Sequence, residues 1–213
     1  MRDQTNHVTH ELRQRILDGV FRPSESLTEV SLAAELGVSR NTIKKALLKL
    51  ENENLVVIEE NKRTRVRWFT VEEVTQYLEV RELLEGFVIR QSAPFFGKAE
   101  LAEMRAILLG MKKCLEAGDL LQYSQHNWRF HDVVYRLCPN RPAVEMIMGI
   151  KNLLKRYNIK AILIQGRGED SLKEHSKILS ALEKRKTEEA ERLMRRHIAN
   201  VRTVLGRHFE LLV

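Results

Sequence analysis

The segment LAAELGVSRNTI, residues 32–43, decides the fold of the N-terminal part of the chain. Its small Ala33 suits a close approach of two helices, and Gly37, four residues later, permits the positive φ of a tight turn. Ile43 follows ten residues after Ala33, at the point where a second helix must pack onto the first. With Ser39 as the N-cap of that second helix, the pattern predicts two crossed helices joined by a short turn.

Upstream of this segment the pattern is also helical. Apolar residues recur at helical spacing through residues 8–17, and Asp18-Gly19 ends that helix. Thr28 suits the N-cap of the first of the two crossed helices. The second crossed helix is expected to continue to about Asn52, because apolar residues keep the helical period up to that point.

Downstream of the crossed helices the pattern is typical of a β-hairpin. Residues 55–58 and 64–68 are rich in β-branched side chains, and the charged residues 59–63 between them predict a turn. Three helices followed by a hairpin indicate a winged helix-turn-helix domain, which we assign to residues 1–69.

The outward face of the second crossed helix is rich in hydrogen-bond donors, and the hairpin tip is basic. From the start of a helix and from a wing, such side chains reach phosphates and base edges of duplex DNA. The alternative is an ordinary solvated basic face, but the turn glycine, the N-cap, the donors and the basic hairpin together favour DNA binding. The predicted DNA-binding residues are Ser39, Arg40, Asn41, Thr42, Lys44, Lys45, Lys49, Lys62, Arg63 and Arg65.

The composition of the chain is compatible with this function without proving it. The formal net charge is +7 and the sequence pI is about 9.5, a balance that permits a nucleic acid partner. The two cysteines are too few for a disulfide scaffold and indicate buried thiols in a reducing cytosol. No apolar run approaches membrane length, so we expect a cytoplasmic protein without a membrane partner.

From residue 70 to the end the pattern is helical, which predicts an antiparallel all-α bundle of six or seven helices in residues 70–213 and a mainly α protein as a whole. One amphipathic stripe within residues 101–115 is typical of a bundle helix that faces a core. The expected helices lie near residues 70–93, which has a potential break, 98–117, 119–137, 142–164, 171–184 and 187–210.

Three histidines of this region lie on apolar helical faces. His131 follows Asn127 by four residues, so both project from one side of a helix, and His175 and His197 occupy stripes of two later helices. Three imidazoles and an amide oxygen can converge on a divalent cation that keeps open positions for a ligand. The alternative, three ordinary core histidines, stays open on spacing alone.

The run LRQRILDGVFRPSESLTEVSLAAELGVSRNTIKKALLKLENENLV, residues 12–56, resembles the N-terminal domain of the GntR family of bacterial transcription regulators. The resemblance implies a repressor that binds a palindromic operator in double-stranded DNA as a homodimer. Members of the family usually carry Thr-Pro-Val-Arg-Glu at positions 41–45, whereas this chain has Asn-Thr-Ile-Lys-Lys. The wing also lacks the usual tip glycine, so we expect an operator unlike the common half-site of the family.

Residues 70–213 resemble the FCD ligand-binding domain of the FadR-type branch of that family, through the segments at 79–85, 127–131, 174–178 and 194–197. The resemblance implies a metal site on Asn127, His131, His175 and His197, with Zn²⁺ as the first choice of ion and Ni²⁺ or Mn²⁺ as alternatives. Asn127 replaces the usual aspartate, and the loss of its negative charge should weaken the hold on a hard cation.

The resemblance also implies an effector, a small carboxylate bound near the metal and held by Arg81. For Arg81 the alternative is a surface ion pair with Glu85, four residues later. Tyr77, Trp128 and Tyr135 are further candidates for the same effector pocket.

Two other functions remain as rivals of an effector-controlled repressor. One is a DNA-binding protein whose bundle only dimerises. The other is a metal-dependent hydrolase, the weaker rival because no acidic residue is expected beside the histidines as a general base: Glu174 adjoins His175 but points about 100° away round the helix. The sequence therefore predicts a regulator and no enzyme.

Overall fold

The computed structural model describes residues 2–59 and 63–212. The chain forms two compact units, residues 1–70 and residues 71–213, which we call the winged unit and the helical unit. The elements of the winged unit are α1 (Arg2–Leu17), β1 (Ser26–Leu27), α2 (Glu29–Leu36), α3 (Arg40–Asn52), β2 (Val56–Ile58) and β3 (Thr64–Val66).

The turn between α2 and α3 forms as the sequence predicts. The Thr28 hydroxyl accepts a hydrogen bond from the backbone N–H of Ser31 at 3.2 Å and caps α2. Gly37 ends α2 with φ +62°, in the left-handed region that favours glycine. The Ser39 hydroxyl accepts from the N–H of Thr42 at 3.1 Å and caps α3, so two caps and one glycine fix the angle at which α3 leaves the turn.

The wing is a small antiparallel sheet with the strand order β1-β3-β2. The expected hairpin corresponds to β2 and β3, each of which is shorter than its β-rich segment. β1 is a strand that the sequence analysis missed: Leu27 pairs with Thr64, and a two-residue strand has no alternation of its own to reveal it. The sheet and α1 enclose the buried face of α3, where Ile43 is completely inaccessible to solvent.

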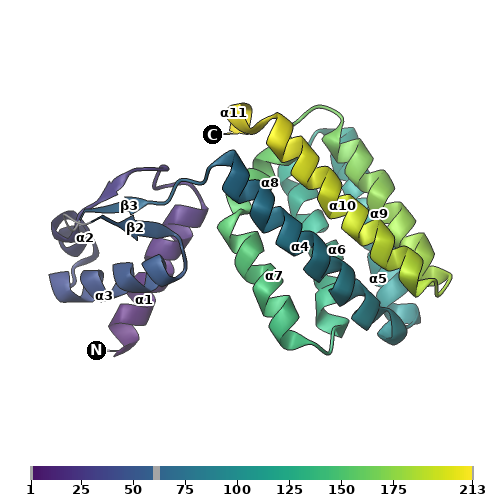
Figure 1. Ribbon diagram of the computed structural model, residues 1–213, viewed down its shortest axis with the longest axis horizontal. Coiled ribbons are helices and arrows are strands. Elements are labelled where there is room, and N and C mark those ends of the chain that lie inside the picture. The colour runs from purple at the N-terminus through teal and green to yellow at the C-terminus, as the bar shows by residue number, and fades with distance from the viewer. Residues whose placement is uncertain (1, 60–62, 213) are drawn as a thin grey trace. The chain divides into compact units, whose positions relative to one another are not determined.

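The helical unit is an all-α bundle, as predicted (Figure 1). In Figure 1, α10 runs beside α4, and these two helices form the most extensive pairing of the unit. The elements are α4 (Val71–Ser92), the 3₁₀ turn η1 (Ala93–Phe95), α5 (Lys98–Ala117), α6 (Leu120–Leu137), α7 (Arg141–Leu153), α8 (Lys155–Ile162), α9 (Arg167–Glu183), α10 (Thr187–Arg207) and α11 (Phe209–Leu212).

Several helix boundaries differ from the prediction, and the helix expected over 187–210 ends at Arg207 and is followed by the short α11. The helix expected over 142–164 divides into α7 and α8 at Leu154, whose buried side chain turns into the core while its N–H bonds to the Ile150 carbonyl at 3.0 Å. No glycine or proline marks this break, so the sequence gives no local signal for it. α9 begins at Arg167, four residues early, and α4 runs without the potential break.

None of the described helices combines the length and the apolar character that a bilayer-spanning segment needs.

Candidate DNA-binding surface and metal centre

The exposed side of α3 carries most of the predicted DNA-binding residues. Arg40 has 69% of its side chain exposed, and its one ion-pair contact among the described residues, with Glu29, is a distant 3.9 Å. Asn41, Lys44 and Lys45 are also exposed and have no ion pair among the described residues. These four side chains therefore remain available to an external partner at the start of a helix, where phosphates and base edges are contacted.

Other predicted DNA-binding residues already have partners within the winged unit. Lys49 donates to the Asn6 amide oxygen at 2.7 Å and so ties α3 to α1. Arg65 pairs with Glu59 at 3.0 Å and donates to the Ser24 carbonyl at 3.1 Å, which braces the wing.

The hydroxyl groups at the start of α3 are also engaged with each other. Ser39 Oγ lies 2.8 Å from Thr42 Oγ1, in addition to its role as the cap. Arg63, at the wing tip, is exposed, and the predicted contact residue Lys62 lies outside the described residues. Of the ten predicted residues, Arg40, Lys44, Lys45 and Arg63 thus have the environment that a phosphate contact needs.

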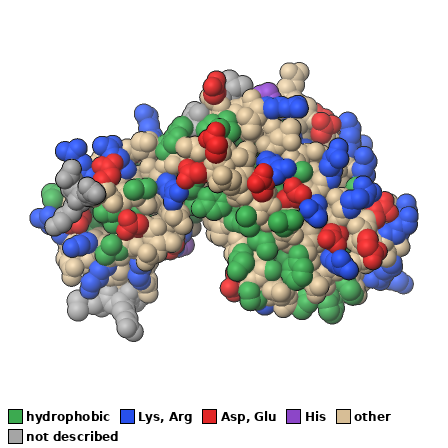
Figure 2. Space-filling model, in the orientation of Figure 1, with side chains coloured by type: hydrophobic (Ala, Val, Ile, Leu, Met, Phe, Trp, Pro, Cys, Tyr) green, Lys and Arg blue, Asp and Glu red, His purple; other side chains and the backbone are tan. Residues whose placement is uncertain are grey.

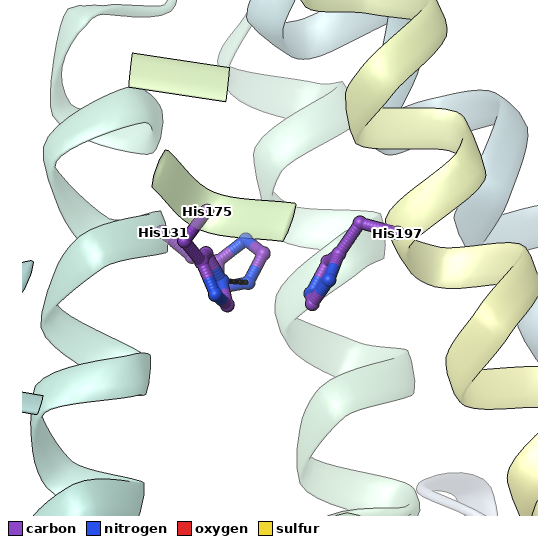
Figure 3. Close-up of side chains that lie close together, drawn as sticks. All are labelled: His131, His175 and His197. Atoms are coloured by element: carbon purple, nitrogen blue, oxygen red, sulfur yellow. Dashed lines mark hydrogen bonds between the residues drawn. The ribbon is translucent and has the colours of Figure 1, made fainter. Parts of the chain in front are cut away.

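In the helical unit, three buried histidines from three helices point toward one another (Figure 3). His131 belongs to α6, His175 to α9 and His197 to α10, and one nitrogen from each lies within 4.8 Å of the others. The Nε2 atoms of His131 and His175 are 3.3 Å apart. Two nitrogens that share a tetrahedral Zn²⁺ ion are separated by about the same distance, because each Zn–N bond is about 2.0–2.1 Å long.

The outer nitrogens of His175 and His197 determine how these two rings are oriented. Nδ1 of His175 lies 2.7 Å from the Ser171 carbonyl, which can only accept, so Nδ1 carries the proton and Nε2 carries a lone pair. Nδ1 of His197 lies 2.6 Å from Glu174 Oε2 and is a donor in the same way. Backbone and carboxylate acceptors of this kind hold metal-binding imidazoles in the ligating tautomer.

Glu174 is itself held in place by two further side chains. Arg167 donates to its Oε2 at 3.0 Å, and Asn200 donates to its Oε1 at 2.7 Å. Burial alone would raise the pKa of Glu174. The hydrogen bond to His197 is the largest of the effects that outweigh burial and lower this pKa to about 2. The carboxylate therefore stays charged at neutral pH and keeps His197 oriented.

His131 faces a different carboxylate, Glu85 of α4, with Nδ1 3.6 Å from Glu85 Oε2. Arg81 Nε donates to Glu85 Oε1 at 3.0 Å, and the Tyr135 hydroxyl donates to the same oxygen at 2.6 Å. Burial opposes the charge of Glu85, but interactions with His131 and Arg81 outweigh it and lower the pKa of this carboxyl group. We call Arg81, Glu85 and Tyr135 the buried network.

Burial keeps the three imidazoles neutral. It lowers the pKa of His131 to about 3, although Glu85 acts in the opposite direction. Burial likewise lowers the pKa of His175 well below its ordinary value, and the pKa of His197 also falls. Neutral imidazole is the form that binds metal, so no proton has to leave these rings at neutral pH.

Asn127 lies one helical turn before His131 on α6. Its side-chain oxygen Oδ1 is buried without a hydrogen-bond partner among the described residues. A buried acceptor without a donor is costly and is rare in folded proteins. A cation would satisfy this oxygen, so three neutral imidazoles and one unpaired amide oxygen fit the donor set of a Zn²⁺ site.

The four predicted effector residues have different environments. Arg81 pairs with Glu85, as the alternative reading proposed, but the pair is buried and does not lie on the surface. Tyr135 belongs to the same buried network, Trp128 is 44% exposed, and Tyr77 is half-buried. Arg81 and Tyr135 thus bond to the carboxylate that faces His131, and the Tyr135 ring stacks on the His131 imidazole with centroids 6.1 Å apart.

The expectation that no acidic residue lies beside the histidines was wrong. Glu174 and Glu85 contact the outer Nδ1 atoms of His197 and His131. The signal for Glu174 was its place next to His175, but a helical wheel drawn for α9 alone cannot reveal a partner on α10. Glu174 is hydrogen-bonded to His197 and orients its ring, whereas Glu85 Oε2 lies beyond hydrogen-bond distance of His131 Nδ1.

Comparison with known proteins identifies both units. The profile of the family described as "Bacterial regulatory proteins, gntR family" matches residues 4–66, and that of the "FCD domain" matches residues 76–200, more than half of the chain. The HTH-type transcriptional regulator YdhC of Bacillus subtilis, itself uncharacterised, is 24% identical over 189 residues, which cover 88% of this chain and 84% of that protein.

Two further matches agree with these profiles. The HTH-type transcriptional repressor RspR of Escherichia coli is 23% identical over 190 residues, 89% of this chain and 83% of its own length. The crystal structure of a GntR-type transcriptional regulator from Rhodococcus sp. RHA1 superposes with a TM-score of 0.75 at 25% identity, over 96% of this chain and 98% of that one. These relatives are transcription regulators, and none of the three is named as an enzyme.

Proposed function

Because the chain belongs to the GntR family of bacterial transcription regulators and carries an FCD domain, we propose that it is a cytoplasmic, homodimeric repressor that a small carboxylate releases from its operator. The protein is a transcriptional regulator and not an enzyme. The observation that carries the finer proposal is the convergence of three buried, neutral imidazoles, two of which donate through Nδ1 to a fixed acceptor.

We assign operator contact to the start of α3 and to the wing. Arg40, Lys44 and Lys45 are exposed cations on one helix, and Asn41 among them can pair with adenine in the major groove. Arg63 would contact the flanking backbone from the wing. Ser39 and Thr42 then serve chiefly to fix the helix start, since their hydroxyls bond to each other.

In this proposal His131, His175 and His197 hold a divalent cation, Zn²⁺ in the first place, and Asn127 supplies the fourth donor. The cation provides a Lewis-acidic position to which a carboxylate can bind. Support comes from the orphaned Asn127 oxygen and from the orienting contacts of Ser171 and Glu174. An effector can change the DNA affinity only as far as it binds one arrangement of the protein, DNA-competent or not, more tightly than the other.

An exposed apolar face on α4 and α7 supports the dimer (Figure 2). Val80, Leu83 and Phe87 are spaced by three and four residues on α4 and are 51%, 58% and 39% exposed. Met146 of the neighbouring α7 is 62% exposed. Large contiguous apolar surface on a soluble protein marks an interface, and a two-fold dimer presents two α3 helices to a palindrome.

The dimer is tested by Leu83→Asp, with Leu121→Asp on α6 as the control, because Leu121 is equally apolar and is 68% exposed outside this face. Sedimentation velocity should show a dimer for the wild type and for the control and a monomer for Leu83→Asp. A monomeric wild type, or a dimer that survives Leu83→Asp, contradicts this interface.

The repressor proposal is tested on operator DNA selected by the full chain from a random pool. Fluorescence anisotropy should be measured with chelator-treated protein, zinc-loaded protein, and zinc-loaded protein with lactate as a small carboxylate. Lactate should weaken operator binding of the zinc-loaded protein and leave the chelator-treated protein unchanged. If operator affinity is the same in all three states, the bundle serves dimerisation alone and the effector part of the proposal is wrong.

A further inference from the structure

Lys151 of α7 is a cation that the sequence analysis missed and that borders the proposed metal centre. Its Nζ atom lies 3.4 Å from the Tyr135 hydroxyl and 4.9 Å from the centroid of the Tyr135 ring. The ammonium group has three hydrogens to donate, and this hydroxyl is its one hydrogen-bond acceptor among the described residues. No carboxylate in that part of the chain forms an ion pair with it.

The charges around Lys151 do not balance. Arg81 and Glu85 neutralise each other in the buried network, and burial, followed by the charge of Glu85, raises the pKa of the Tyr135 hydroxyl well above 10, so it stays neutral. Asp132 lies 3.2 Å from Arg136, which also pairs with Glu103 at 2.8 Å, so this exposed group contributes no unpaired cation. With the histidines neutral as well, Lys151 adds a positive charge to the buried network and has no carboxylate at ion-pair distance among the described residues.

An uncompensated cation in such surroundings is unfavourable unless an anion joins it. Burial, followed by repulsion from Arg81, lowers the pKa of Lys151 to about 7, although Glu85 and Asp132 favour its charged form. An anionic group placed beside Nζ would remove this penalty, because it supplies the counter-charge that the protein itself lacks.

Lys151 also adjoins an exposed side chain. The residue is half-buried, and its Nζ lies 6.0 Å from the ring centroid of the exposed Trp128, the residue that follows Asn127. Lys151 therefore contacts the buried network on one side and an exposed aromatic ring on the other. Arg81, the effector residue expected from the sequence, is in contrast already compensated by Glu85.

We propose that Lys151 binds a second acidic group of the effector, so that the ligand of the helical unit is a small dicarboxylic acid. This inference rests on the proposed effector site: one carboxylate binds at the metal centre, and the other pairs with the Lys151 ammonium. Lys151 thus determines specificity, because a monocarboxylic acid leaves its charge uncompensated.

The test compares lactate with malate, two 2-hydroxy acids that share the metal-binding hydroxyl and carboxylate and differ in the second carboxylate. Isothermal titration calorimetry is carried out on the zinc-loaded full chain. A charge-assisted hydrogen bond predicts that malate binds at least about tenfold more tightly than lactate. Lys151→Met should remove this preference while lactate binding stays unchanged, and Lys151→Arg should keep it.

The matched control is Lys113→Met on α5, because Lys113 is exposed and has no ion pair among the described residues; this variant should keep the malate preference. Unchanged lactate binding by Lys151→Met reports that the variant is folded. Equal affinities for the two acids in the wild type, or a malate preference that survives Lys151→Met, overturn the role of Lys151 alone. If the zinc-loaded wild type binds neither acid, the proposed effector site itself is wrong, and this inference with it.

Discussion

The two units of the chain place their polar groups in opposite ways. On α3 the candidate contact residues Arg40, Lys44 and Lys45 are exposed and lack close ion-pair partners within residues 2–59 and 63–212. In the helical unit the three candidate histidine ligands are buried, and His175 and His197 each have a hydrogen-bond partner that orients the ring. Exposed donors suit a partner as large as a duplex, whereas buried and oriented donors suit an ion or a small acid. The comparison therefore predicts different sensitivities for the two units.

The largest expected difference is in the response to acid. The pKa values of His131, His175 and His197 lie below the ordinary 6.5, so below that pH the unfolded chain binds protons that the folded unit does not. The stability of the metal-free helical unit should therefore fall as the pH drops from about 6.5, by up to about 2 kcal/mol for each histidine at pH 5. The pKa of Glu174 is also low, and its protonation adds to the loss only below about pH 4.5.

Hydrogen exchange followed by mass spectrometry measures this response region by region in chelator-treated protein. Between pH 7 and pH 5, peptides from α6, α9 and α10 should lose protection, after correction for the intrinsic pH dependence of exchange. Peptides from α3 should not, because the two histidines of the winged unit, His7 and His10, are exposed. Equal losses of protection in both units would contradict the predicted difference in their response to acid.

The next effect concerns the metal. Removing one ligand with His175→Ala should lower zinc affinity at least about 100-fold, because structural zinc sites draw their binding energy from a few ligands that act together. Competition with a chromophoric chelator measures this affinity. His10→Ala is the control, since His10 is an exposed imidazole of the winged unit. An unchanged zinc affinity of His175→Ala would show that the ion binds elsewhere.

A smaller effect on zinc affinity is expected for a residue that contacts a proposed ligand and not the metal itself. Glu174→Gln leaves an oxygen to accept from His197 Nδ1 but removes the negative charge, so zinc affinity should fall about 10–100-fold. Glu169→Gln, at an exposed position of the same helix, should leave it unchanged. If the two variants behave alike, Glu174 does not act through His197.

The two units also differ in how much of their structure the sequence predicted. The winged fold was readable because its signals are local: Thr28, Gly37 and Ser39 act on residues within one turn of themselves. β1 was missed because its partners are nearly forty residues away along the chain. The break at Leu154 was missed because a buried side chain, and no glycine or proline, sets it.

In the helical unit, helical periodicity placed His131, His175 and His197 on inward faces, and the structure brings them together. Periodicity could not show that Glu85, 46 residues before His131, lies behind its ring, nor that Lys151 adjoins Tyr135. Such contacts depend on how α4, α6 and α7 pack against one another. A pattern within one helix carries no information about that packing.

The smallest effect separates two cations within the winged unit. Arg40→Ala should weaken operator binding about tenfold and lower the salt dependence by about one released counterion, because the exposed guanidinium is free to contact a phosphate or a base. Lys49→Ala should change the affinity by less than about threefold, since Lys49 is held by Asn6 at 2.7 Å. Anisotropy titrations at several salt concentrations measure both quantities. Equal losses for the two variants would mean that Lys49 leaves Asn6 when the protein binds DNA, and that an intramolecular partner does not exclude a role at the duplex.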